Sequence, residues 1–67
     1  MTYFECKAAT FNGNVVVGKG STMENAFEAA QAEAQAIGSL IRKITSKREC
    51  VEVYAEGKRA YTFRFPV

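Results

Sequence analysis

The chain has no histidine and no tryptophan among its 67 residues, and it contains one proline and two cysteines. Without histidine there is no Ser–His or Cys–His pair for nucleophilic catalysis, and the commonest metal ligand is missing too. The glutamates outside the predicted helix fall on predicted strands and turns, where solvation is the default. The sequence therefore predicts no catalytic residue, no metal site and no cofactor, and we expect a protein that is not an enzyme.

Long apolar runs are also missing: none approaches the length of about 18 residues that a membrane-spanning helix needs. The opening residues MTYFECKAAT lack the basic and apolar regions of a signal peptide. We therefore expect a cytoplasmic protein, with Cys6 and Cys50 as free thiols. The hydrophobic content of 48% suffices for a globular core and is too high for disorder. This length predicts a single domain, residues 1–67.

The segment Ser21–Ile44 carries the one long helical pattern of the chain. Its apolar residues recur in steps of three or four, which predicts a helix with one face on a core. Ser21 and Glu24 predict a capping box at its start, and Gly38 is a point where the helix kinks or ends. Phe27 and Ile37 are expected to be buried. The apolar positions are Met23, Ala26, Phe27, Ala30, Ala34, Ile37, Ile41 and Ile44.

Alternating segments before and after the helix predict two β-hairpins. In the first, Asn12-Gly13 predicts a two-residue type I′ turn between residues 2–11 and 15–17. That register brings one set of side chains to the core face: Phe4, Cys6, Ala8, Val15 and Val17. In the second hairpin, residues 49–54 and 58–65, side-chain parity favours a three-residue loop at residues 55–57. It brings together Val51, Val53, Tyr61 and Phe63.

The element order ββαββ predicts an α+β fold, a two-layer sandwich in which one helix packs on one face of a four-stranded sheet. A right-handed crossover over the helix favours the strand order 2-1-4-3, with strands 1 and 4 parallel and central. By strand parity Cys6 points into the core and Cys50 points to the other face, so the two thiols should not pair.

The order hairpin–helix–hairpin, the opening Met-Thr-Tyr, the Asn12-Gly13 turn and the alanine-rich helix resemble the small immunoglobulin-binding β-grasp domains of bacterial surface proteins. This resemblance covers most of the chain and implies the architecture. The chain has no wall-anchoring or secretion segment, so immunoglobulin binding is not implied.

A second, local resemblance covers residues 11–40, where Gly18-Lys19-Gly20 precedes the alanine-rich helix. This segment is similar to the last part of double-stranded-RNA-binding domains, whose lysines near the helix start grip phosphates. Met23 and Glu24 stand at the matching positions, so those binding residues are not carried over. The run Thr22, Glu24, Ala26 also resembles the helix start of HicB-type antitoxins, but their preceding segment with proline and cysteine is missing.

The candidate binding residues lie on the sheet face predicted to point away from the helix: Tyr3, Phe11, Val16 and Tyr54. Exposed aromatic residues beside basic ones suit a protein interface, a homodimer face or the stacking of RNA bases. Glu5 and Glu52 on the same face favour contact with protein. The alternative site is a basic cluster at the predicted helix end, which could contact nucleic-acid phosphates: Arg42, Lys43, Lys47 and Arg48.

The sequence thus predicts a small non-enzymatic protein-binding module whose partner is another protein or a second copy of the chain. Its size and the missing active site suit an accessory or inhibitor protein of a bacteriophage or mobile element, for example in an anti-defence role. The alternative is a nucleic-acid-binding protein that uses the basic cluster and the aromatic residues of the sheet.

Overall fold

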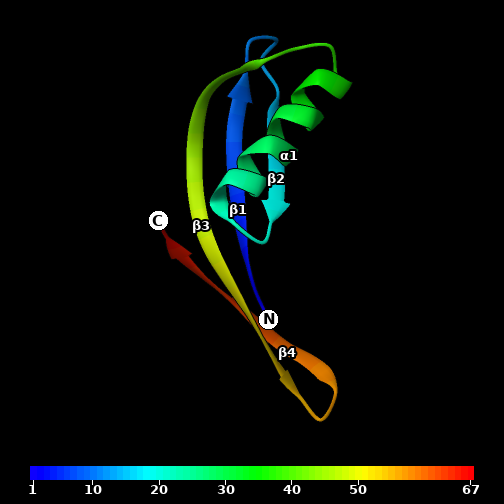
Figure 1. The fold of residues 1–67 in the computed structure, drawn as a ribbon, viewed down its shortest axis with the longest axis vertical. Helices are drawn as coiled ribbons and strands as arrows, with labels where there is room; N and C mark the ends of the chain where they lie inside the picture. The colour runs from blue at the N-terminus through cyan, green and yellow to red at the C-terminus, as the bar shows by residue number, and fades with distance from the viewer.

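The computed structural model describes residues 1–67 apart from the side chains of Ala55, Arg59 and Ala60. Its strands form one antiparallel four-stranded sheet, and one helix lies against one side of that sheet (Figure 1). The predicted α+β class, with four strands and one helix, is confirmed. In chain order the elements are β1 (Thr2–Thr10), β2 (Val15–Gly20), α1 (Met23–Ala36), β3 (Ile41–Ala55) and β4 (Lys58–Pro66).

The strand order is β2-β1-β3-β4 and every neighbouring pair is antiparallel, so the predicted order 2-1-4-3 with parallel central strands is wrong. The physical reason is the length of β3, which has 15 residues. Its first part pairs with β1, from Ile41 opposite Thr10 to Val51 opposite Thr2, and its last part pairs with β4. The place beside β1 that the prediction gave to the last strand is therefore taken by β3.

The helix is shorter at both ends than predicted. Its N-cap is Thr22, whose Oγ1 accepts a hydrogen bond from the Asn25 amide at 3.0 Å, so the predicted Ser21–Glu24 capping box is wrong. At the other end Gly38, with φ of +72°, donates its N–H to the Gln35 carbonyl at 3.0 Å, and Ser39 donates to the Ala34 carbonyl at 2.9 Å. These two bonds form a Schellman motif, which ends the helix. The β-branched residues after it continue as β3.

The first hairpin closes with a three-residue loop, residues 11–13, rather than the predicted two-residue turn. The Thr10 amide donates to the Asn14 carbonyl at 2.8 Å, and only Gly13 in the loop has positive φ, whereas a type I′ turn needs positive φ at both central residues. The register moves by one residue, so that Ala8 pairs with Val16. Val16 consequently turns into the core, and the predicted core residues Val15 and Val17 are exposed.

The second hairpin turns through two residues, Glu56 and Gly57, which both have positive φ. The predicted three-residue loop is therefore wrong. An irregularity in the pairing between Val53 and Tyr54 shifts the register back, and Val53 still lies opposite Tyr61. The predicted grouping of Val51, Val53, Tyr61 and Phe63 on one face is confirmed, but it results from a two-residue turn and a register shift and not from a three-residue loop.

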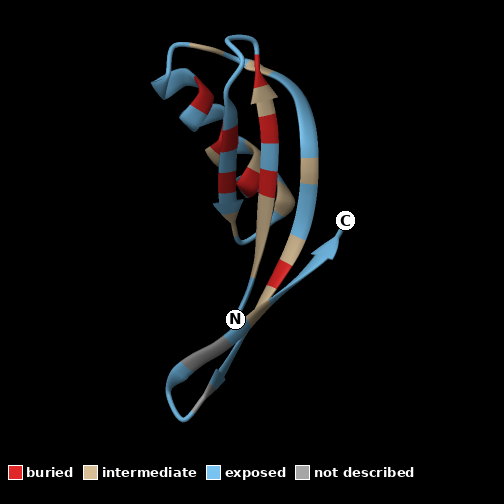
Figure 2. Cartoon of the chain, turned by 180° about the vertical axis from the view of Figure 1, so that it is seen from behind, coloured by how far each residue is buried: buried red, intermediate tan, exposed pale blue. Residues whose placement is uncertain are grey.

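Close contact between α1 and β2 determines where the helix sits. A Cβ atom at Gly18 would overlap the backbone of Ala26 and Ala30, and one at Gly20 would lie 2.7 Å from the Ala26 amide nitrogen. Only glycine permits this approach, since any side chain would push the helix away. The helix consequently packs on β2 and β1 and scarcely touches β3 (Figures 1 and 2). The apolar residues buried around this contact are Cys6, Ala8, Val16, Ala26, Ala30 and Ala34.

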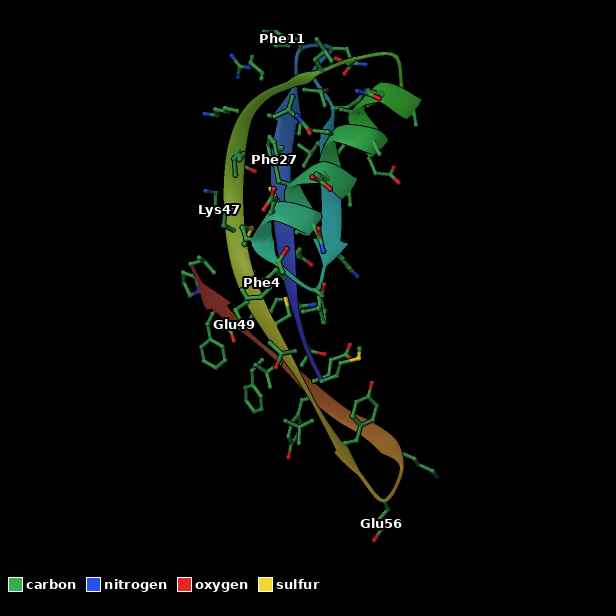
Figure 3. All side chains as sticks on the ribbon, in the orientation of Figure 1. Phe4, Phe11, Phe27, Lys47, Glu49 and Glu56 are labelled. Carbon is green, nitrogen blue, oxygen red and sulfur yellow. The ribbon has the colours of Figure 1, made fainter. Side chains whose placement is uncertain are left out.

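The rest of the predicted helical stripe is less buried than expected. Phe27 is half-buried, and Ile37, which forms the C-cap, is exposed. Because the alanine side of the helix faces β2, Phe27 points sideways toward the space above β3 (Figure 3).

Replacing Gly18 by alanine tests this contact. We expect Gly18→Ala to lower the free energy of unfolding by about 3 kcal/mol or more, because the new methyl group meets backbone atoms that cannot rotate away. Urea unfolding followed by circular dichroism measures the change. Val17→Ala is the matched control: it places alanine at the neighbouring position on the opposite face, and it should change the stability by about 0.5 kcal/mol. Equal effects of the two changes would contradict the close contact.

Candidate protein-binding surface

The sheet face that points away from α1, called the outer face below, is defined by residues that lie opposite one another in the strand register. Tyr3, Glu5 and Lys7 alternate along β1 on this side, while Cys6 and Ala8 face the helix. The residues beside them on the neighbouring strands are Val17 and Lys19 on β2, Lys43, Ser46, Arg48, Cys50, Glu52 and Tyr54 on β3, and Thr62 and Arg64 on β4.

Basic side chains predominate on the outer face. Its described residues include five basic side chains and only two acidic ones, Glu5 and Glu52. On the far side of the molecule α1 carries Glu24, Glu28 and Glu33 and no lysine or arginine. The two sides of the protein therefore differ in charge, although the net charge of the whole chain is only +2. The basic residues of the outer face are Lys7, Lys19, Lys43, Arg48 and Arg64.

Tyr3 is held in place by its neighbours on three strands. The Lys19 ammonium lies 5.8 Å from the centroid of its ring, within the range of a cation–π interaction. Burial raises the pKa of the Tyr3 hydroxyl, and a hydrogen bond with Cys50 and the negative charge of Glu52 act in the same direction, while Arg64 opposes them. The phenol therefore stays neutral at physiological pH and acts as a hydrogen-bonding group.

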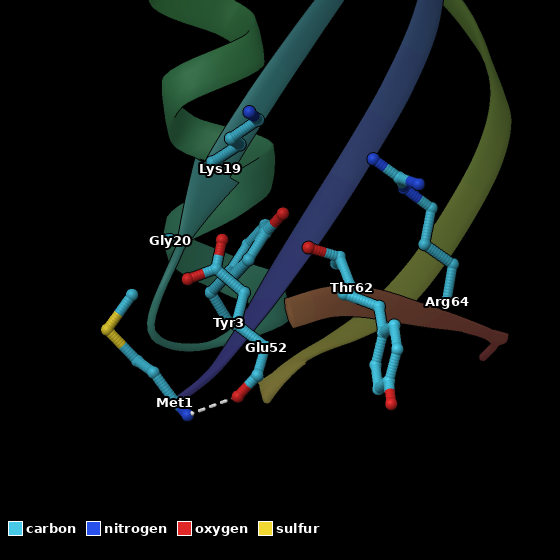
Figure 4. A pocket seen from close by; sticks show the side chains of 8 residues that line it. Met1, Tyr3, Lys19, Gly20, Glu52, Thr62 and Arg64 are labelled. Carbon is cyan, nitrogen blue, oxygen red and sulfur yellow. Dashed lines mark hydrogen bonds between the residues drawn. The ribbon is translucent and has the colours of Figure 1, made fainter. Parts of the chain in front are cut away.

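An open cleft lies at the end of the outer face near the start of the chain (Figure 4). The Met1 amino group donates a hydrogen bond to the Glu52 carbonyl oxygen at 2.9 Å, and the Tyr54 hydroxyl donates to the Glu52 carboxylate at 2.7 Å. This cleft combines cationic and aromatic side chains, which suits an acidic group of a partner. The lining residues are Met1, Tyr3, Lys19, Gly20, Glu52, Tyr61, Thr62 and Arg64.

Two of the four predicted protein-binding residues, Tyr3 and Tyr54, lie on the outer face; Tyr54 is 51% exposed. Phe11 is also exposed, but it belongs to the β1–β2 loop at the opposite end of the molecule (Figure 3). Val16 is 7% exposed and packs beneath the helix, so its predicted position on the outer face is wrong. The one-residue shift of the first hairpin is the cause, since it exchanges the faces of all β2 side chains.

The predicted basic cluster does not lie at the helix end, because α1 ends before Gly38 and the cluster belongs to β3. Lys43 and Arg48 pair with Ala9 and Glu5 and lie on the outer face, but Lys47 pairs with Cys6 and lies on the helix side. Arg42 is exposed at an irregular point of the β1–β3 pairing. Because successive side chains of a strand point to opposite faces, the basic residues that were expected to form one cluster at the helix end are divided between the two faces of the sheet.

Sequence reasoning missed Lys19 as a site residue and missed the exposed apolar residues beyond the helix. In the structure Glu5 lies opposite Lys19. The two-residue turn predicted for the first hairpin gives a different register, so the position of Lys19 beside Glu5 was missed. The residues on the helix side of the second hairpin were correctly grouped, but the helix was expected to cover them. Those that remain exposed are Val53, Tyr61, Phe63 and Phe65.

In the described part of the chain, no group of three or more His, Cys, Asp or Glu residues could hold a metal ion. No helix of that part is both long enough and apolar enough to span a bilayer. Comparisons with family models, curated proteins and solved structures found no match, so the three resemblances noted above remain predictions.

The thiols provide a test of the site geometry. Cys6 faces the helix as predicted, and Cys50 lies on the outer face between Tyr3 and Arg64, yet both are fully buried. Burial also raises the pKa of the Cys6 thiol, partly offset by Lys47. We expect both thiols of the folded protein to react with a thiol reagent about a hundredfold more slowly than in urea.

Tyr3→Ala supplies the control for the thiol experiment, because Tyr3 lies beside Cys50 and on the other face from Cys6. This variant should speed the reaction of Cys50 and leave that of Cys6 unchanged, which mass spectrometry of the labelled peptides can show. Rapid labelling of Cys50 in the unaltered folded protein would contradict the shielded position.

Proposed function

We propose that the protein is a small, non-enzymatic protein-binding module whose outer face docks on an acidic surface of its partner. The observation that carries the proposal is the excess of basic side chains on the outer face, five against two acidic ones among the described residues. Charge complementarity of this kind accelerates association and selects among partners. Tyr54 and Arg64 add the residue types that contribute most to the energy of protein interfaces.

The arrangement of the aromatic residues favours a protein over a nucleic acid as the partner. Stacking of bases needs aromatic rings with a free face beside phosphate-binding cations. One face of the Tyr3 ring is approached by Lys19, and the Tyr54 hydroxyl is engaged with Glu52. Glu5 and Glu52 would also repel a phosphate backbone that crosses the sheet. The alternative function, nucleic-acid binding, still shares the same basic residues and is an outcome of the test below.

A module of this size would act by occupying a surface of its partner, which is how a small inhibitor or accessory protein works. The phage or mobile-element origin, the anti-defence role and the cytoplasmic location are part of the same proposal and stay predictions.

Removing two outer-face charges tests the proposal. The double variant Lys7→Gln, Arg48→Gln should lose on the order of tenfold in affinity for acidic partner proteins, since it removes central cations of the face. The measurement is quantitative retention of proteins from a nuclease-treated bacterial lysate on the immobilised chain. The control Arg42→Gln, Lys58→Gln removes the same charge at exposed positions outside the outer-face set and should retain the wild-type pattern.

A parallel titration with single-stranded RNA, single-stranded DNA and duplex DNA decides between the two classes of partner. Binding to nucleic acid that weakens steeply with salt, together with no protein retained from the nuclease-treated lysate, would replace the protein-binding proposal by the alternative. Equal retention by the outer-face variant and its control would show that the outer face is not the binding surface.

A further inference from the structure

The core of the chain is made of small side chains only. The buried apolar residues in the described part are alanines, cysteines and Val16, while every phenylalanine is half-buried or exposed. The accessible surface is 4591 Å², against about 4,200 Å² for a compact monomer of this mass. The radius of gyration is 13.2 Å, against about 11 Å for a compact chain of this length. The molecule therefore leaves apolar surface in water that a domain of its size would normally bury.

The excess surface comes from an arm, residues 51–63, in which β3 and β4 continue as a bare hairpin beyond α1 (Figure 1). On the helix side of this arm and just beside it, Tyr61, Phe63 and Phe65 are 60%, 47% and 52% exposed. Tyr61 and Phe63 also contact each other edge to face, with ring centroids 5.4 Å apart. At roughly 200 Å² for each aromatic side chain, these three leave about 300 Å² of mostly apolar surface uncovered.

A groove of similar character lies at the other end of the same face, beside α1 and above β3. Its floor is formed by Ile41 and Ile44, and Phe27 and Met23 of the helix form one wall. Leu40, at the end of the groove, is 62% exposed. The helix covers β2 and β1 and leaves this strip of β3 open, so the groove and the arm lie one after the other along the helix side of β3 and are together called the band below. Polar side chains of the helix, Glu24, Gln31 and Gln35, line the rim of the groove. Lys47 and Glu49, labelled in Figure 3, lie between the two apolar ends.

The middle of this band carries two opposite charges. Lys47 lies opposite the core residue Cys6 and lines the groove, and Glu49 lies opposite Phe4 on one side and Phe65 on the other. Among the described residues, neither Lys47 nor Glu49 makes an ion pair or a side-chain hydrogen bond within the chain. Along β3 the helix-side order is thus two isoleucines, a lysine, a glutamate and two valines: Ile41, Ile44, Lys47, Glu49, Val51 and Val53.

We infer that a second copy of this chain covers the band, in a two-fold symmetric dimer whose axis crosses β3 near Arg48. The band is self-complementary when it is turned end for end, since apolar ends meet apolar ends and Lys47 of each copy meets Glu49 of the other. A two-fold interface requires this kind of self-complementary surface. A second copy alone therefore accounts for the opposite charges of Lys47 and Glu49 on either side of the centre of the band, without an unrelated partner.

The shape of the molecule agrees with this arrangement. When the two copies pack face to face and antiparallel, the arm of each copy lies over the groove of the other, because the arm carries no helix and the groove is flanked by one. A stable dimer buries about 800 Å² per partner, so the arm and the groove of each copy must both take part in the contact. The outer faces stay exposed, so the dimer goes beyond the proposed function and does not depend on it.

Charge reversal at the centre of the band tests the dimer. Sedimentation equilibrium of the unaltered chain should give twice the chain mass of 7.4 kDa. Lys47→Glu and Glu49→Lys should each raise the dissociation constant of the dimer by about tenfold or more, because each brings like charges together across the axis. The double variant Lys47→Glu, Glu49→Lys exchanges the charges and should restore dimerisation. Lys43→Glu, the same change on the outer face of the same strand, should have no effect.

Because dimerisation completes the core, far-UV circular dichroism will show whether a single variant unfolds when it dissociates. In that case the double variant should recover both folding and dimer mass, and a melting temperature that rises with protein concentration supports the dimer further. A well-folded monomer at the highest soluble concentration would overturn the inference and leave the outer-face proposal intact. So would a dimer that resists both single reversals, or one that the double variant fails to restore.

Discussion

The structure depends on the backbone contact between α1 and β2. Gly18 and Gly20 present no side chain toward the helix, and the helix presents only the small side chains of Ala26, Ala30 and Ala34 toward the strand. This pairing of small residues gives a short distance between helix and strand and many dispersion contacts over a small area. It also restricts the helix to one edge of the sheet, because the glycines lie on the edge strand β2 and not in the centre. A helix held at an edge cannot cover four strands.

The incomplete cover explains why the large apolar residues gather where they do. The space beneath the helix is thin and is filled by Cys6, Ala8 and Val16. Larger side chains do not fit in so thin a layer. Phe4 and Phe27 lie half-buried at its margin, and Phe63 and Phe65 lie on the uncovered strand β4. In the proposed dimer these margins become the second core. The division between a small core within the chain and a large-residue core between chains is a physical consequence of the glycine contact.

The sequence predicted the number, type and order of the elements, since long-range periodicity and turn residues mark them strongly. It did not predict the strand order or the register of the first hairpin, because Asn12-Gly13 suits both a two-residue turn and a three-residue loop with Gly13 at positive φ. That ambiguity moved Val16 from the outer face into the core and hid the position of Lys19 beside Glu5. Tyr3 and Tyr54, on strands whose faces did not depend on this turn, were placed on the correct side.

The end of the helix at Gly38 has the widest consequences for the surface. Isoleucines spaced by three and four suit a helix, but the Schellman motif stops α1 first, and residues 41–55 become a strand with a period of two. Alternate residues of this strand then lie on the two opposite faces of the sheet. Lys43 and Arg48 join the basic outer face, while Lys47 and Glu49 lie at the centre of the apolar band. One glycine at the helix end therefore allows a single strand to supply the charge of one proposed interface and the axis of another.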